Sequence, residues 1–117
     1  MKHSYFKLAE SEAWKSNHRI KIGAVLVHNG RPINTAHNIV GKSHPRTKWF
    51  IHAEHNALLG IHRKDLTGSE MYVFRVNSFG RRGNCRPCDN CRLLMKEVGV
   101  KKVFYTNSEG QYEHETL

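Results

Sequence analysis

The first third of the chain places apolar side chains at helical and then at strand spacing. Residues 4–17 have a helical pattern, and the serine that opens them is a suitable N-cap. Residues 20–27 alternate apolar and other positions, and the Asn29-Gly30 pair after them is typical of a two-residue hairpin turn. The pattern predicts a helix and then two paired strands, the second running from about Pro32 to Ile39.

The second half of the chain alternates strands and helices. Residues 71–76 and 103–106 are rich in β-forming residues, and a helix is expected between them, with Pro87 in its first turn. A strand, a helix and a strand in this order predict a right-handed crossover and parallel pairing. Residues 111–116 follow a turn and are expected to return as a fifth strand, antiparallel to the fourth.

A polar stretch, residues 41–48, separates the hairpin from another helix that begins near His52. Ala53, Ala57 and Ile61 recur at spacings of four and give this helix an apolar face that can lie on a sheet. Together the elements predict an α/β protein in three layers, with a mixed five-stranded sheet and helices on both faces.

The size of the chain limits its domain organisation. With 117 residues, of which 38% are hydrophobic, there is room for a single domain, residues 1–117, around one core. No stretch approaches the roughly 18 apolar residues of a membrane span. The N-terminus also lacks the apolar core of a signal peptide. We therefore expect a cytoplasmic protein with no membrane partner.

The chain is strongly basic, with a formal net charge of +9. A field of this sign attracts phosphate groups, whether they belong to a nucleotide or to a nucleic acid. A solvated basic surface that only keeps the protein in solution is the alternative explanation.

Two motifs carry the most specific chemistry in the chain. They are the tripeptide His52-Ala53-Glu54 and a Pro-Cys-x-x-Cys motif whose cysteines are Cys88 and Cys91. His52, Cys88 and Cys91 supply three zinc ligands. A structural zinc takes four protein ligands, whereas a hydrolytic zinc keeps one position for water. The set therefore predicts a catalytic zinc site in which the carboxylate of Glu54 is available to move protons.

The cysteines agree with this interpretation. Two of the three form the Cys-x-x-Cys pair, which indicates metal binding in a reducing compartment rather than a disulfide framework. Both ligand segments are expected at helix N-termini, whose partial positive charge, together with zinc, favours the thiolate form of Cys88 and Cys91.

These motifs resemble those of the zinc nucleobase deaminases. The resemblance covers nearly the whole chain and implies the cytidine deaminase fold. The His-Ala-Glu box is similar to that of deoxycytidylate, tRNA-adenosine and polynucleotide cytidine deaminases, while the final antiparallel hairpin is more like the cytidine deaminase branch. Small phage deaminases combine such features.

The resemblance also implies the reaction. Water replaces the amino group at C4 of cytosine, and Glu54 carries the water proton to ring N3 and then protonates the departing ammonia. Because a straight helix places residues two apart on different faces, Glu54 needs the looser geometry of a first turn to act beside the metal.

Further residues are candidates for substrate contacts. By resemblance, Asn38 hydrogen-bonds a sugar hydroxyl and Ala53 offers backbone groups to the base. A local turn role is the alternative for Asn38. Arg86 lies in a basic loop and could hold a phosphate with its forked donors, or it could simply be solvated. Trp49 could stack on a base or belong to the core.

Two further groups of residues extend these candidates. Phe50 and Phe79 are aromatic residues near the motifs that could stack like Trp49, and basic residues gather in the two loops before the motifs, namely Lys42, Arg46, Lys48, Arg81 and Arg82. Cys85 precedes the Pro-Cys-x-x-Cys motif and could be a fourth thiolate. That would close the zinc site and make the chain a non-catalytic nucleic-acid-binding module, but Cys85 lies off the helical stripe of the other two cysteines.

The sequence therefore predicts a zinc-dependent cytosine deaminase that acts on a free nucleotide or nucleoside, most plausibly of the deoxycytidylate type. The small size favours this substrate class, since a polynucleotide deaminase must also bind flanking nucleotides. The charge and the loop arginines keep single-stranded DNA or RNA as the alternative substrate. Relatives are commonly oligomeric, so a homo-oligomer is also a candidate.

Overall fold

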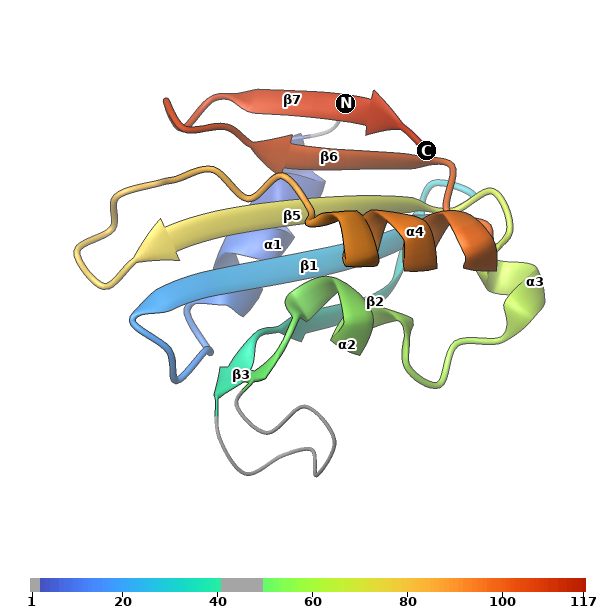
Figure 1. The fold of residues 1–117 in the computed structure, drawn as a ribbon, viewed down its shortest axis with the longest axis horizontal. Helices are drawn as coiled ribbons and strands as arrows, with labels where there is room; N and C mark the ends of the chain where they lie inside the picture. Colours follow the sequence, from blue (N-terminus) through green and yellow to red (C-terminus); the bar gives the residue numbers. More distant parts are fainter. Residues whose placement is uncertain (1–2, 41–49) are drawn as a thin grey trace.

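A computed structural model describes residues 3–40 and 50–117, and it includes all of their side chains except those of residues 39, 40, 50 and 51. Its centre is a five-stranded sheet in the order β2-β1-β5-β6-β7 (Figure 1). The pair β5 and β6 is parallel and the other neighbours are antiparallel, which confirms the predicted mixed sheet. The strands are β1 (Ile20–His28), β2 (Arg31–His37), β5 (Glu70–Asn77), β6 (Lys102–Thr106) and β7 (Tyr112–Thr116).

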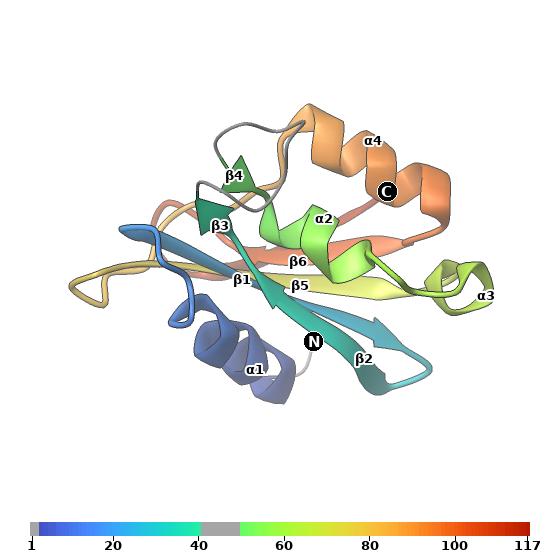
Figure 2. The same ribbon diagram turned by 90° about the horizontal axis from the view of Figure 1, so that it is seen from below.

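Helices cover both faces of the sheet, as predicted. Helix α1 (His3–Ala13) lies on one face, while α2 (Ala53–Leu58) and α4 (Asp89–Val98) lie on the other (Figure 2). The structure adds two short features that the sequence analysis missed, a helix α3 (Arg63–Leu66) and a two-stranded sheet of β3 (Ile39–Val40) and β4 (Phe50–Ile51).

The alternation of side chains along the strands supplies both faces with apolar residues. On β5, Met71 and Val73 belong to the core beneath α2 and α4, and Tyr72 and Phe74 belong to the core beneath α1. A strand that is buried on both faces is expected to be almost continuously apolar, and this explains the density of β-forming residues in 71–76.

The predicted hairpin turn is confirmed. Asn29 and Gly30 have φ angles of 51° and 72°, the left-handed pair that a two-residue turn between twisted strands requires. Tyr5 on α1 donates a hydrogen bond of 2.6 Å to the carbonyl of Gly30 and thereby ties the turn to the helix.

Some predicted boundaries were wrong. Helix α1 begins at His3 and ends at Ala13, so Ser4 lies inside it and is not its N-cap. Pro87 precedes α4, whose N-cap is Cys88. Ile61 follows the end of α2 and only packs against the core from outside the helix.

The second strand also ends earlier than predicted, at His37. Asn38 follows it and interrupts the strand pattern, because its side-chain amide takes the place of a backbone partner for β1. None of the helices within residues 3–40 and 50–117 combines the length and apolar character that a membrane crossing needs.

Candidate active site

The three predicted zinc ligands lie together where the N-termini of α2 and α4 meet. His52 is the N-cap of α2, Cys88 is the N-cap of α4, and Cys91 is in the first turn of α4. Their ligand atoms all lie within 4.8 Å of one another. The structure therefore unites residues that are separated by more than thirty positions in the chain.

The spacing of these atoms suits zinc. The Sγ of Cys91 lies 3.5 Å from Nδ1 of His52. Tetrahedral zinc, with Zn–S near 2.3 Å and Zn–N near 2.0 Å, holds sulfur and nitrogen ligands roughly 3.5 Å apart. One imidazole and two thiols in this arrangement fit the metal and leave a fourth position for a non-protein ligand.

The backbone at His52 explains how Glu54 reaches the same site. His52 has an extended conformation, with φ −65° and ψ 142°, so its side chain does not follow the helical periodicity of α2. Glu54 is 5% exposed, and its carboxyl group contacts the thiol of Cys91 through a hydrogen bond. The looser first-turn geometry that the sequence analysis required is therefore present.

Burial governs the protonation of these groups. It raises the pKa of the Glu54 carboxyl, and this is the direction that suits a group exchanging protons near neutrality. Burial, together with a smaller effect from His55, lowers the pKa of His52 and favours the neutral imidazole that binds metals.

Cys91 is a buried thiol beside the carboxyl group of Glu54. Burial first, and then the neighbouring Glu54, raise the pKa of Cys91. Both effects disfavour the charged thiolate, whereas zinc and the helix terminus, which were expected to favour it together, act in the opposite direction.

A cavity of about 340 Å³ opens beside the ligands, within the usual size range of small-molecule sites. It brings together three of the predicted substrate contacts, Asn38, Ala53 and Arg86, with Glu54. Trp49 lies outside the described residues, as do Lys42, Arg46 and Lys48. The side chain of Phe50 is also outside the description.

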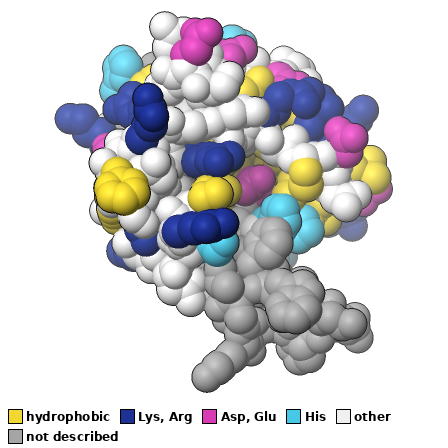
Figure 3. Space-filling model, turned by 60° about the vertical axis from the view of Figure 1, so that its left-hand side comes forward, with side chains coloured by type: hydrophobic (Ala, Val, Ile, Leu, Met, Phe, Trp, Pro, Cys, Tyr) yellow, Lys and Arg dark blue, Asp and Glu magenta, His cyan; other side chains and the backbone are white. Residues whose placement is uncertain are grey.

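The cavity wall also contains residues that the sequence analysis missed: His18, Arg75 and Asn84. None of the three belongs to a sequence motif. They lie near the start of β1 or the end of β5, and the pairing of these strands brings the two segments together. Figure 3 shows Lys and Arg side chains next to a hollow in which an acidic side chain and a histidine lie close together.

Asn38 sits at the floor of the cavity in a fixed orientation. It is 5% exposed, its Oδ1 accepts a hydrogen bond of 2.9 Å from the N–H of Ile22, and its Nδ2 donates one of 2.9 Å to the carbonyl of Ile20. An amide has two N–H donors, so one is left for a sugar hydroxyl. The structural role and the predicted substrate role are compatible.

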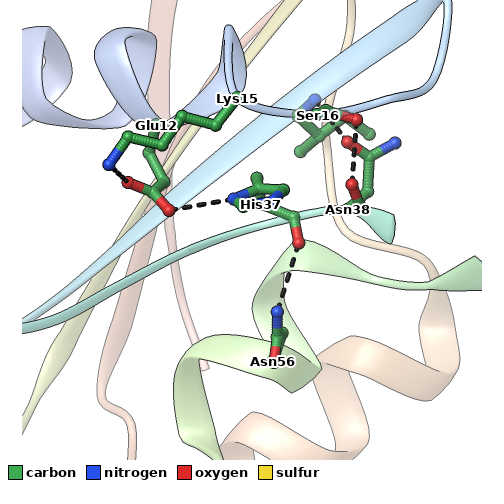
Figure 4. Close-up of polar contacts among 7 residues, drawn as sticks. Glu12, Lys15, Ser16, His37, Asn38 and Asn56 are labelled. Atoms are coloured by element: carbon green, nitrogen blue, oxygen red, sulfur yellow. Dashed lines mark hydrogen bonds and ion pairs between the residues drawn. The ribbon is translucent and has the colours of Figure 1, made fainter. Parts of the chain in front are cut away.

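A polar network behind Asn38 joins α1, β2 and α2 (Figure 4). Ser16 donates to the carbonyl of Asn38 at 2.8 Å, and the side chain of Asn56 donates to the carbonyl of His37 at 3.3 Å. Nδ1 of His37 lies 2.9 Å from Glu12. His37 is half-buried and has a carboxylate as its partner.

Glu12 is buried within this network, where burial and hydrogen bonding act on its pKa in opposite directions. Burial would raise the pKa of the carboxyl, but the hydrogen bonds from His37 and Lys15 outweigh it, and the pKa is lowered. The carboxylate thus stays ionised and anchors His37 at the end of β2, next to Asn38.

Arg86 lines the cavity but is already engaged by an acidic residue. Its Nε and Nη2 donate to the two carboxylate oxygens of Glu115 at 2.5 and 3.0 Å. Glu115 also accepts a hydrogen bond of 2.8 Å from the hydroxyl of Tyr105. The phosphate role predicted for Arg86 would therefore have to use its remaining N–H groups.

Cys85 lines the same cavity but does not belong to the group of three residues whose ligand atoms lie close together. Its Sγ lies 3.1 Å from Oγ1 of Thr106 and 3.3 Å from the carbonyl of Val73. Burial raises the pKa of the Cys85 thiol to about 12, so the thiol form predominates at neutral pH. Its partners within the described residues account for its burial without a metal.

Comparisons with known proteins agree with this geometry. The model of a family described as the cytidine and deoxycytidylate deaminase zinc-binding region matches residues 1–107. A search of curated proteins found no match.

Solved structures of deaminases are similar in fold. The deoxycytidylate deaminase of cyanophage S-TIM5 in its apo form is 29% identical, with a TM-score of 0.70 over 92% of this chain and 86% of that one. The same phage enzyme in complex with dCMP and dUMP is 27% identical over 92% and 85%, with a TM-score of 0.68. The cytidine deaminase of Burkholderia pseudomallei has a TM-score of 0.74 over 99% and 92%, and its 23% identity supports the fold alone.

Proposed function

Because this chain belongs to the cytidine and deoxycytidylate deaminase family, we propose that it converts cytosine to uracil in a free nucleotide or nucleoside, with deoxycytidylate as the preferred substrate type. The observation that carries the proposal is the meeting of His52, Cys88 and Cys91 with the buried Glu54 at one cavity. The chain would act as a single zinc-dependent deaminase domain.

His52, Cys88 and Cys91 would hold the zinc, which when bound lowers the pKa of water and acts as a Lewis acid. Glu54 would take a proton from the attacking water and deliver it to N3 of the ring, and a second proton would leave with the amino group as ammonia. The C–O bond forms and the C–N bond breaks at C4, so that cytosine and water give uracil and ammonia. The raised pKa of Glu54 supports its use in both directions.

Two observations support a nucleotide over a free base. The relative of 29% identity is a deoxycytidylate deaminase, and the net charge of +9 favours a phosphate-bearing substrate. A reducing compartment, such as the cytoplasm, agrees with three free cysteines. A homo-oligomer remains part of the proposal on the basis of the family alone.

The test is to incubate zinc-loaded protein with deoxycytidine, deoxycytidylate, its triphosphate and cytosine-containing oligonucleotides of DNA and RNA, and to measure base conversion by mass. We expect the highest kcat/KM for deoxycytidylate. Glu54→Ala should keep one zinc per chain and lower kcat by about 10²- to 10⁴-fold, the usual contribution of a general acid and base.

Two outcomes would contradict the proposal. A Glu54→Ala protein whose kcat equals that of the wild type would exclude the carboxylate from the reaction, and absence of conversion of every cytosine substrate by the wild type would reject the substrate class.

A second candidate substrate is single-stranded nucleic acid, and one surface feature favours it. Phe79 is 96% exposed in the turn after β5. The turn is ordered by Asn77, whose Oδ1 accepts hydrogen bonds of 2.9 Å from the N–H groups of Phe79 and Arg81. An exposed aromatic ring beside cationic groups is typical of surfaces that stack unpaired bases, and the oligonucleotides in the assay test this candidate.

A further inference from the structure

The two arginines in the cavity wall differ in their electrostatic pairing. Arg86 is joined to Glu115 by two hydrogen bonds. Arg75 forms no ion pair with any carboxylate of the described residues. Arg75 is therefore a positive charge of the wall that has no acidic partner in the described part of the chain.

The stem of Arg75 is nevertheless well positioned. It lies on β5, half-buried, and its Nη1 donates a hydrogen bond of 2.9 Å to the carbonyl of Asn84. Gly83 packs against it so closely that an added Cβ would lie 3.1 Å from Nε. One N–H of the guanidinium is used in this way, and the others stay available for a ligand.

Arg75 also lies near the proposed chemistry without belonging to the zinc ligands. The charges of Glu54 and Arg75 both act on the pKa of the Cys85 thiol. All three residues line the same cavity. Arg75 lies two residues after Val73 on β5, a distance of roughly 7 Å, and the carbonyl of Val73 contacts Cys85. A ligand whose reactive ring lies at Glu54 can therefore extend within the same cavity toward Arg75.

We propose that Arg75 recognises the phosphate group of the substrate and so selects nucleotides over nucleosides. This inference rests on the proposed cytosine deamination. A guanidinium is suited to the role because its planar, forked donors match phosphate oxygens and it stays charged when partly buried. The phosphate is either the monoester of a free nucleotide or the diester of a strand, since both present at least two non-bridging oxygens to a forked donor.

The experiment compares Arg75→Gln, Arg75→Lys and the wild type, using deoxycytidine, deoxycytidylate and a cytosine-containing oligonucleotide. The readout is the kcat/KM for each phosphate-bearing substrate divided by that for deoxycytidine. We expect Arg75→Gln to lower the ratio by about 10- to 100-fold, as expected for loss of charge-assisted hydrogen bonds. Arg75→Lys should restore part of it, because the charge remains and the fork is lost.

Arg31→Gln is the matched control. Arg31 is exposed and pairs with His28 at the far end of β1 from Ile20, which lines the cavity. The length of β1 places Arg31 roughly 26 Å from Ile20 and the cavity. This variant also removes one positive charge, so an equal fall of the ratio in both variants would assign the effect to net charge and overturn the proposal.

The remaining outcomes are distinct. An equal loss for deoxycytidine and deoxycytidylate in Arg75→Gln, with zinc retained, would make Arg75 a support for the loop at Asn84 and would overturn the phosphate role. A ratio that falls for the monoester or for the oligonucleotide identifies which source of phosphate Arg75 binds. Failure of the proposed function would instead appear in the wild type, as absence of conversion of all three substrates.

Discussion

The three cysteines have different surroundings although they lie within one short segment. Cys88 is exposed and Cys91 is buried, yet both offer sulfur to the same site with His52. Cys85 instead contacts Thr106 and the carbonyl of Val73. At the residue scale, the contacts of Cys85 within the core distinguish it from the two cysteines that are candidate zinc ligands.

Replacement of Cys85 tests this distinction. Cys85→Ala should leave one zinc per chain with two sulfur ligands by X-ray absorption spectroscopy. It should lower the free energy of unfolding by about 1–2 kcal/mol, because the N–H of Thr106 loses a buried sulfur acceptor. Loss of zinc from this variant would instead support a closed site with Cys85 as the fourth ligand. Cys88→Ala, which should lose zinc, is the positive control.

At the scale of elements, the packing of α1 on β1 depends on a missing side chain. A Cβ on Gly23 would lie 1.9 Å from the carbonyl oxygen of Ala9 and 2.5 Å from the nitrogen of Ala13. The helix therefore approaches the strand at backbone distance. This contact matters for the site, because β1 also carries Ile20 and Ile22 in the cavity wall and holds Asn38 through its backbone.

Gly23→Ala is therefore expected to displace α1 and to lower the free energy of unfolding by about 3 kcal/mol, at the upper end of typical overpacking effects. Urea denaturation measures it. Gly60→Ala is the comparison, because Gly60 has open space around it and φ +75°, so that only backbone strain of about 1 kcal/mol is added there. Equal losses in the two variants would show that contact with α1 is not the cause.

At the scale of the whole molecule, Glu115 links the last strand to the cysteine segment. It binds Arg86 just before the ligands, Arg92 on α4 at 3.2 Å, and Tyr105 on β6. Hydrogen bonding from Arg86, which outweighs partial burial, lowers the pKa of Glu115. Burial and then Glu115 itself raise the pKa of Tyr105 to about 12, which keeps its hydroxyl protonated as a donor.

This carboxylate predicts a pH dependence of stability. A group whose pKa is lower in the folded state stabilises the fold above its unfolded pKa, and this contribution is lost as the pH falls through the folded value. Wild type should therefore have a higher Tm than Glu115→Gln at pH 7, and the difference should shrink as the pH falls below about 4.3. Zinc release in acid affects both proteins, so the difference between them is the measurement. A difference that stays constant with pH would contradict the assignment.

Much of the fold follows from patterns that are local in the sequence. The Asn29-Gly30 turn, the parallel crossover from β5 to β6 and the antiparallel return of β7 were predicted, since turn chemistry and connection handedness are local or general rules. The end of β2 was not predicted, because Asn38 breaks the strand through a side-chain bond to a strand sixteen residues away.

The sequence by itself determined the candidate zinc ligands, the neighbouring carboxylate and the three-layer class, because motif composition and apolar periodicity are properties of short segments. Only the tertiary structure decided which side chains share the cavity with them. Arg75 and His18 carry no motif, and the sheet brings them to the site through the pairing of β1 with β5. It also decided that Arg86 is paired with Glu115 and that burial raises the pKa of Cys91, since charge pairing and solvent exclusion depend on segments that are distant in the chain.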